Sequence, residues 1–244
     1  MGGLQKTTLI DFPGRVACTV FTVGCNFRCP FCHNSDLVSK ERFEKAGLAR
    51  FGEEEFFAFL ERRKKILDGV CITGGEPTLW PDLPKFCKGI KDKGLEVKLD
   101  SNGSNPEMLR RLLKEELVDF VAMDVKARFE EYDRAIGGRR VKVERIKESI
   151  KVIWRSGVEY ELRTTVVPGI HSKEGLEGLA EEVAELAKEE GYPVEKVVYV
   201  LQRFRPKNCL DPRLEKREPF SEKKMEEFLR AVKRVLPQAV LRGE

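Results

Sequence analysis

Six short apolar runs recur along the chain, and each is followed by a stretch with apolar residues at helical spacing. The runs expected as strands are residues 16–23, 70–73, 95–99, 118–123, 158–167 and 194–201. The helices expected after them are residues 53–67, 81–93, 106–115, 142–155, 173–190 and 220–236. Strands that alternate with helices form parallel sheets with right-handed crossovers, and six units are too few to close a barrel that normally takes eight. We therefore predict an α/β fold, an open partial (βα)6 TIM-like barrel.

The chain as a whole is predicted to form a single domain over residues 1–244, because no low-complexity linker interrupts it. No segment approaches eighteen uninterrupted apolar residues, and the first residues lack a signal-peptide pattern. A cytoplasmic location with reduced thiols is therefore expected. The net charge of +4 is spread along the sequence, which gives no reason to expect nucleic acid or a membrane as a partner.

Three of the seven cysteines, Cys25, Cys29 and Cys32, lie within eight residues, directly after the first apolar run. Soft thiolates bind zinc or iron–sulfur clusters. A structural zinc ion takes four protein ligands, whereas a four-iron cluster held by three thiolates keeps one iron free for another ligand. His33 is the candidate fourth zinc ligand, but adjacent residues such as Cys32 and His33 rarely reach one tetrahedral ion together. The spacing favours a cluster, and a zinc-binding interaction module is the alternative.

Polar residues follow the next predicted strands where each one ends. Gly74-Gly75-Glu76-Pro77 allows a close backbone approach and offers a carboxylate to an ammonium group. Asp100-Ser101-Asn102-Gly103 and Asp124-Val125-Lys126 follow the third and fourth strands. Arg163 lies within the fifth strand, where a buried charge is costly unless an anionic group meets it. Because barrels carry their chemistry at the carboxyl ends of strands, these residues are expected around one site.

The stretch Cys25-Asn26-Phe27-Arg28-Cys29-Pro30-Phe31-Cys32 resembles the Cys-x3-Cys-x2-Cys signature of the radical S-adenosylmethionine (radical SAM) superfamily. The following His33-Asn34, the opening Asp11-Phe12-Pro13-Gly14 and the two aspartate motifs are similar to the enzymes that activate glycyl-radical enzymes. The resemblance covers nearly the whole chain and implies a partial barrel of the radical SAM type.

The resemblance also implies the site's ligands. Cys25, Cys29 and Cys32 would bind three irons of a [4Fe–4S] cluster, and SAM would chelate the fourth iron. SAM contacts are implied for Gly74, Gly75, Glu76, Ser101, Asn102, Lys126 and Arg163. Asp100 and Asp124 would help to hold a monovalent cation, and no catalytic residue is expected beyond the cluster and SAM. Gln202-Arg203-Phe204 stands where the activating enzyme of pyruvate formate-lyase has a Tyr-His contact to SAM, so the chain departs from that enzyme there.

The implied activity is the reductive cleavage of SAM to generate a glycyl radical on a partner enzyme. The expected partner is anaerobic ribonucleoside-triphosphate reductase, and the expected electron donor is a flavodoxin or ferredoxin. A pyruvate formate-lyase-type activating enzyme and a radical SAM enzyme acting on a small molecule are the alternatives.

Four other features carry structural expectations only. Leu9, Ile10 and Phe12 are expected along the barrel edge, and His171 in a loop is expected at the surface. Cys209 lies in a polar loop without a neighbouring cysteine and receives no role.

Overall fold

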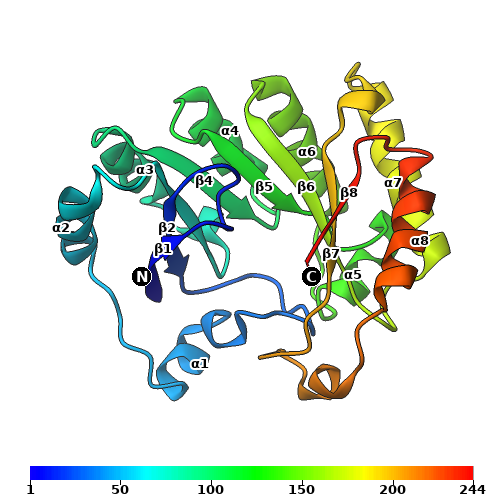
Figure 1. The fold of residues 1–244 in the computed structure, drawn as a ribbon, viewed down its shortest axis with the longest axis horizontal. Coiled ribbons are helices and arrows are strands. Elements are labelled where there is room, and N and C mark those ends of the chain that lie inside the picture. Colours follow the sequence, from blue (N-terminus) through cyan, green and yellow to red (C-terminus); the bar gives the residue numbers. More distant parts are fainter. Residues whose placement is uncertain (244) are drawn as a thin grey trace.

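A single eight-stranded sheet organises the protein, whose computed structural model describes residues 1–243 (Figure 1). The strands are β1 (Gly3–Thr8), β2 (Ala17–Thr22), β3 (Gly69–Gly74), β4 (Glu96–Ser101), β5 (Phe120–Asp124), β6 (Glu159–Val166), β7 (Tyr199–Arg203) and β8 (Val240–Arg242). They neighbour one another in chain order; β1 pairs antiparallel with β2, and all later pairs are parallel. The sheet does not close, because β1 and β8 form its two edges. The predicted open α/β barrel is confirmed.

Among residues 1–243, eight α-helices lie between the strands in sequence, and most of them line the outside of the curved sheet (Figure 1). They are α1 (Lys40–Lys45), α2 (Glu53–Arg63), α3 (Leu83–Lys91), α4 (Pro106–Lys114), α5 (Tyr132–Ala135), α6 (Val143–Ser156), α7 (Lys173–Glu189) and α8 (Glu222–Lys233). Ile146, Ile150 and Ile153 of α6 are fully buried at the helical spacing that predicted them. No helix among residues 1–243 is long and apolar enough to cross a membrane.

The N-terminal segment differs from the prediction. It forms the edge strand β1, and Leu9 and Ile10, which directly follow this strand, are 71% and 81% exposed, so their side chains do not pack against the barrel. Phe12 instead turns inside and packs edge-on against Phe120, with ring centroids 6.0 Å apart. A side chain on Gly69 would meet the Phe12 ring at 2.8 Å, so the glycine makes room for it. Phe12 therefore fills the base of the barrel.

The barrel interior changes character from its base to the carboxyl ends of the strands. An apolar cluster of Phe12, Ala17, Phe120 and Ala122 occupies the base. The charged side chains of Lys98 on β4 and of Glu161 and Arg163 on β6 lie further along the barrel interior. The loops after the strands enclose the end of the barrel opposite the base. The fold thus gathers segments far apart in sequence around one end of the sheet.

Candidate active site

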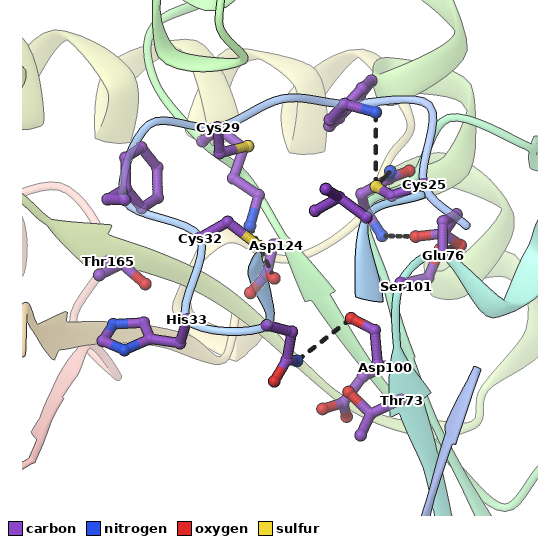
Figure 2. A pocket seen from close by; sticks show the side chains of 18 of the residues that line it. Cys25, Cys29, Cys32, His33, Thr73, Glu76, Asp100, Ser101, Asp124 and Thr165 are labelled. Atoms are coloured by element: carbon purple, nitrogen blue, oxygen red, sulfur yellow. Dashed lines mark hydrogen bonds and ion pairs between the residues drawn. The ribbon is translucent and has the colours of Figure 1, made fainter. Parts of the chain in front are cut away.

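A cavity of about 240 Å³ lies at the carboxyl ends of the strands (Figure 2). All of the predicted site residues line it: Cys25, Cys29, Cys32, Gly74, Gly75, Glu76, Asp100, Ser101, Asn102, Asp124, Lys126 and Arg163. They come from the loop after β2, from the ends of β3, β4 and β5 with the residues that follow them, and from the middle of β6. The structure brings the predicted set together, and the ligand contacts of its members stay predictions.

The cysteine loop is held by hydrogen bonds to backbone carbonyl groups. The Arg28 guanidinium donates hydrogen bonds to the carbonyl groups of Cys25 (2.6 Å) and Phe27 (2.7 Å). The Cys25 amide donates to the Val38 carbonyl at 3.0 Å, and the Arg28 amide donates to Ile136 at 3.1 Å. These hydrogen bonds therefore hold the curvature of the loop.

The three thiols are free and face the cavity, as Figure 2 shows. Burial raises the pKa of Cys25 to about 11 and that of Cys29 to about 12. Each thiol must therefore give up its proton when a metal binds. Thiolates are the donors that iron–sulfur clusters use, so the donor chemistry fits such a cluster.

His33 does not complete a metal site with these sulfur atoms. Figure 2 shows its ring turned away from them, and the ring lies 6.0 Å from that of Phe204, centroid to centroid. Within residues 1–243, no three His, Cys, Asp or Glu side chains converge on a position for one metal ion. Three thiols without a fourth protein ligand suit a cluster with one open iron better than a structural zinc ion.

The two glycines after β3 allow a close approach to the cysteine loop. Gly74 has a φ of +109°, and a side chain on Gly75 would meet the Gly24 carbonyl oxygen at 2.1 Å. The Glu76 amide donates to that same Gly24 carbonyl at 2.8 Å. The loop after β3 is thereby fastened to the residue before Cys25.

Replacing Gly75 with alanine is expected to displace the cysteine loop. The added methyl group cannot fit beside the Gly24 backbone, so the free energy of unfolding should fall by about 2 kcal/mol or more. Iron content after anaerobic reconstitution should fall with it. Gly175→Ala is the matched control, since a side chain there meets only Ser172 Oγ at 3.5 Å. Full iron loading and unchanged stability of Gly75→Ala would contradict this reading.

The carboxylate of Glu76 joins two of the loops. It is 2% exposed; Oε1 accepts hydrogen bonds from Ser101 Oγ (2.8 Å) and the Thr78 amide (3.2 Å), and Oε2 accepts one from the Asn102 amide (2.7 Å). Burial raises the pKa of Glu76, while these donors act in the opposite direction. Glu76 therefore holds the loop after β4 against the loop after β3, and a contact with SAM stays a prediction.

Amide groups approach the sulfur of Cys25. The Asn102 side chain lies 3.8 Å from Cys25 Sγ and donates to Asn26 Oδ1 at 2.9 Å. The Phe27 amide donates to the same sulfur at 3.4 Å. Hydrogen bonds to ligating sulfurs tune the reduction potential of a cluster, so Asn102 would affect that potential if Cys25 is an iron ligand, which stays a prediction.

Fixed charges line the wall formed by β5 and β6. Asp124 Oδ1 accepts a hydrogen bond from Arg163 Nε at 3.0 Å, and Oδ2 pairs with Lys126 Nζ at 2.8 Å. Burial opposes ionisation, but the charges of Arg163 and Lys126 outweigh it and lower the pKa of Asp124 to about 2. Arg163 Nη1 also lies 3.5 Å from Asp100 Oδ2. The anionic groups that this buried arginine requires are therefore carboxylates of the same chain.

His171 is buried, contrary to the predicted surface placement, whereas Cys209 lies in a loop as predicted and is buried there. His171 Nδ1 accepts a hydrogen bond from the Val167 amide at 2.9 Å, so Nε2 carries the proton and donates to the Lys126 carbonyl at 2.8 Å. Burial lowers the pKa of His171, which favours this neutral form. His171 thus fixes the backbone of a predicted SAM contact, through a pairing across loops that sequence spacing does not reveal.

Several residues that line the cavity were not predicted, among them Thr73, Thr165 and Gln202. Thr165 lies two residues after Arg163 on β6, so both side chains point to the same face. The two-residue spacing from Arg163 could have identified Thr165 as a cavity residue from the sequence. Gln202 lies near the end of β7, in the segment where the relatives' Tyr-His contact was missing.

Comparisons with known proteins agree with this geometry. The model of the Radical SAM superfamily matches residues 19–181. A protein of Methanocaldococcus jannaschii, named as a candidate glycyl-radical enzyme activating enzyme, is 30% identical over 247 residues, which cover 99% of this chain and 95% of that protein. The pyruvate formate-lyase-activating enzyme of Clostridium pasteurianum is 30% identical over 186 residues, or 72% of this chain and 73% of the relative.

Solved structures share the fold at lower sequence identity. A domain of a pyruvate formate-lyase-activating enzyme from Bacteroides vulgatus has a TM-score of 0.55 at 18% identity, covering 72% of this chain and 99% of the domain. Streptococcus suis SuiB has a TM-score of 0.62 at 12% identity, covering 93% of this chain and 49% of that protein. These likenesses support the barrel architecture.

Proposed function

Because this chain belongs to the radical SAM superfamily, we propose that it is an activating enzyme that generates a glycyl radical on a partner enzyme. The superfamily uses a [4Fe–4S] cluster and SAM. Together these supply a one-electron reduction that breaks the S–C5′ bond of SAM and yields an organic radical able to remove a hydrogen atom from a C–H bond. The protein's part is to bind, orient and enclose these groups.

Different groups of cavity residues would bind the cluster and SAM. Cys25, Cys29 and Cys32 would hold three irons, and the loop after β3 with Gly74 and Gly75 would approach the methionyl end of SAM closely. Lys126 Nζ lies 2.8 Å from Asp124, and Lys126 lines the same cavity, which supports a contact between Lys126 and the SAM carboxylate. Glu76, Ser101 and Asn102 form the opposite wall through their shared hydrogen bonds.

The near full-length match to a candidate glycyl-radical enzyme activating enzyme is the observation that carries the proposal. The cavity gives a second, physical argument. Most of its polar residues are assigned to the cluster, to SAM or to the cation, which leaves His33, Asn34, Thr73, Thr165 and Gln202 to recognise a small polar substrate. A protein substrate brings its own recognition surface, and the unclosed sheet leaves one side of the barrel for it.

We propose anaerobic ribonucleoside-triphosphate reductase as the partner, with a flavodoxin or ferredoxin as the electron donor. The Leu4-Gln5-Lys6-Thr7-Thr8-Leu9-Ile10-Asp11 opening and the lack of an inserted ferredoxin-like cluster region favour this partner over a formate-lyase. We also propose that residues 1–244 act as one radical SAM domain, since one hydrophobic cluster extends from β2 to α8. The location that we propose for the protein is the cytoplasm.

The test is anaerobic incubation of the reconstituted protein, SAM and a reductant with the reductase or the formate-lyase from the same source. Electron paramagnetic resonance should show a glycine-centred doublet on the reductase, and a reductase variant with that glycine replaced by alanine should show none. A doublet on the lyase alone would overturn the choice of partner. The absence of a doublet on any glycyl-radical enzyme, with SAM cleavage coupled to a small molecule, would overturn the activase role.

A further inference from the structure

Lys98 is a buried lysine to which the site described above gives no role. It lies on β4, two residues before Asp100, and its side chain is 2% exposed. Its Nζ forms an ion pair with Asp100 Oδ1 and lies 3.8 Å from Cys71 Sγ. Lysine is almost never fully buried without such a partner. The ammonium group is therefore held inside the barrel, directly beneath the cavity that Asp100 lines.

The carboxylate oxygens of Asp100 and Asp124 are all engaged by cationic side chains. Lys98 pairs with Oδ1 of Asp100, and Arg163 lies 3.5 Å from its Oδ2. Arg163 and Lys126 take the two oxygens of Asp124 at 3.0 and 2.8 Å. A monovalent cation held by these aspartates, which the family resemblance implies, would have to displace one of these groups.

The ion pairs inside the barrel also argue against a bound metal cation. Besides the two aspartates, the buried Glu161 accepts hydrogen bonds from both terminal nitrogens of Arg242, at 2.6 Å each, and lies 3.7 Å from Arg163. Three carboxylates thus face four cationic side chains, including Lys98 and Lys126. Each of these three carboxylates already has a cationic partner, and an added metal cation would have to compete with that partner in a medium that screens charge poorly. The residues present therefore do not fit such an ion.

We propose that the Lys98 ammonium takes the place of the monovalent cation, so that SAM binding by this protein does not depend on potassium or sodium. Lys98 is then a positioning residue: it acts through Asp100, and through Asp100 on Arg163, and keeps the cavity wall charged and in place. A purely structural ion pair would stabilise the fold but would have no bearing on which salt the protein needs to bind SAM.

The test measures SAM affinity by equilibrium titration of the cluster-loaded protein in potassium, sodium or tetramethylammonium chloride at one ionic strength. For the unchanged protein, the three dissociation constants should agree within about twofold. Lys98→Met removes the charge while keeping the length of the side chain. It should bind SAM about tenfold more weakly in tetramethylammonium and recover most of that loss in potassium. Lys91→Met is the control, because Lys91 pairs with Asp119, outside the cavity lining.

Three results would overturn the proposal. The first is an unchanged protein that needs potassium to bind SAM, and the second is an anomalous peak between Asp100 and Asp124 in its crystals soaked in rubidium. The third is a folded Lys98→Met protein with the same SAM affinity in all three salts as the parent. If Lys98→Met does not fold, the two measurements on the unchanged protein decide. None of these uses a partner enzyme, so failure here is separate from failure of the activase proposal.

Discussion

Replacing Cys29 with alanine is expected to abolish cluster assembly and SAM cleavage while the barrel still folds. Cys29 is 7% exposed, and its sulfur faces the cavity beside Cys32 (Figure 2). Two remaining thiolates cannot hold three irons, so 5′-deoxyadenosine formation should fall by about a thousandfold or more. The lost sulfur should cost about 1 kcal/mol of folding free energy. Visible absorbance, iron content and chromatography of the SAM products measure the effect.

Cys87→Ala is the matched control for this variant. Cys87 is fully buried in α3 and does not line the cavity, so its replacement should have a similar effect on stability and leave the cluster in place. A Cys29→Ala protein that bound iron and cleaved SAM at the parent's rate would remove Cys29 from the ligand set.

Replacing Arg163 with methionine is expected to weaken SAM binding by about tenfold or more and to destabilise the fold by about 3–5 kcal/mol. The guanidinium is 11% exposed and pairs with both Asp100 and Asp124, so its loss leaves two neighbouring carboxylates short of a counter-charge. The cluster should still assemble, because the cysteine loop is held by other hydrogen bonds. Urea unfolding, iron content and SAM titration separate these effects.

Two further variants sharpen the Arg163 experiment. Arg163→Lys keeps the charge but not the planar group that reaches both aspartates, so it should fall between the parent and Arg163→Met. Arg15→Met removes an arginine that pairs with Glu96 and does not line the cavity, and it should leave SAM binding unchanged. Parental SAM affinity in Arg163→Met would show that Arg163 does not act at the site.

The sequence predicted the parallel part of the sheet because those strands are buried on both faces and read as apolar runs. The segment Val70 to Ile72, for example, is fully buried, as its composition suggests. The edge strands were missed for the opposite reason. β1 has three consecutive exposed polar residues, Gln5, Lys6 and Thr7, and β8 is three residues long and partly exposed, so neither gives an apolar signal.

The cavity residues were predictable as a group because they follow strands, but their partners were not. Asp124 lies opposite Arg163 only through the register of β5 and β6, which local sequence does not determine. The same holds for Lys98, which reads as an ordinary polar position in a strand. His171 was misplaced because its two partners, Val167 and Lys126, come together only when the loops fold over the barrel.

The pairing of Arg242 with Glu161 means that the interior of the barrel is complete only after β8 has been synthesised. Chains are synthesised from the N-terminal end, so β6 leaves the ribosome well before β8. Until β8 docks, Glu161 lacks the group that satisfies both of its oxygens, and water must solvate it from the unfinished edge. The nascent protein should therefore pass through an incomplete, hydrated barrel that is sensitive to proteases. It should become resistant only when β8 has been synthesised and pairs with β7.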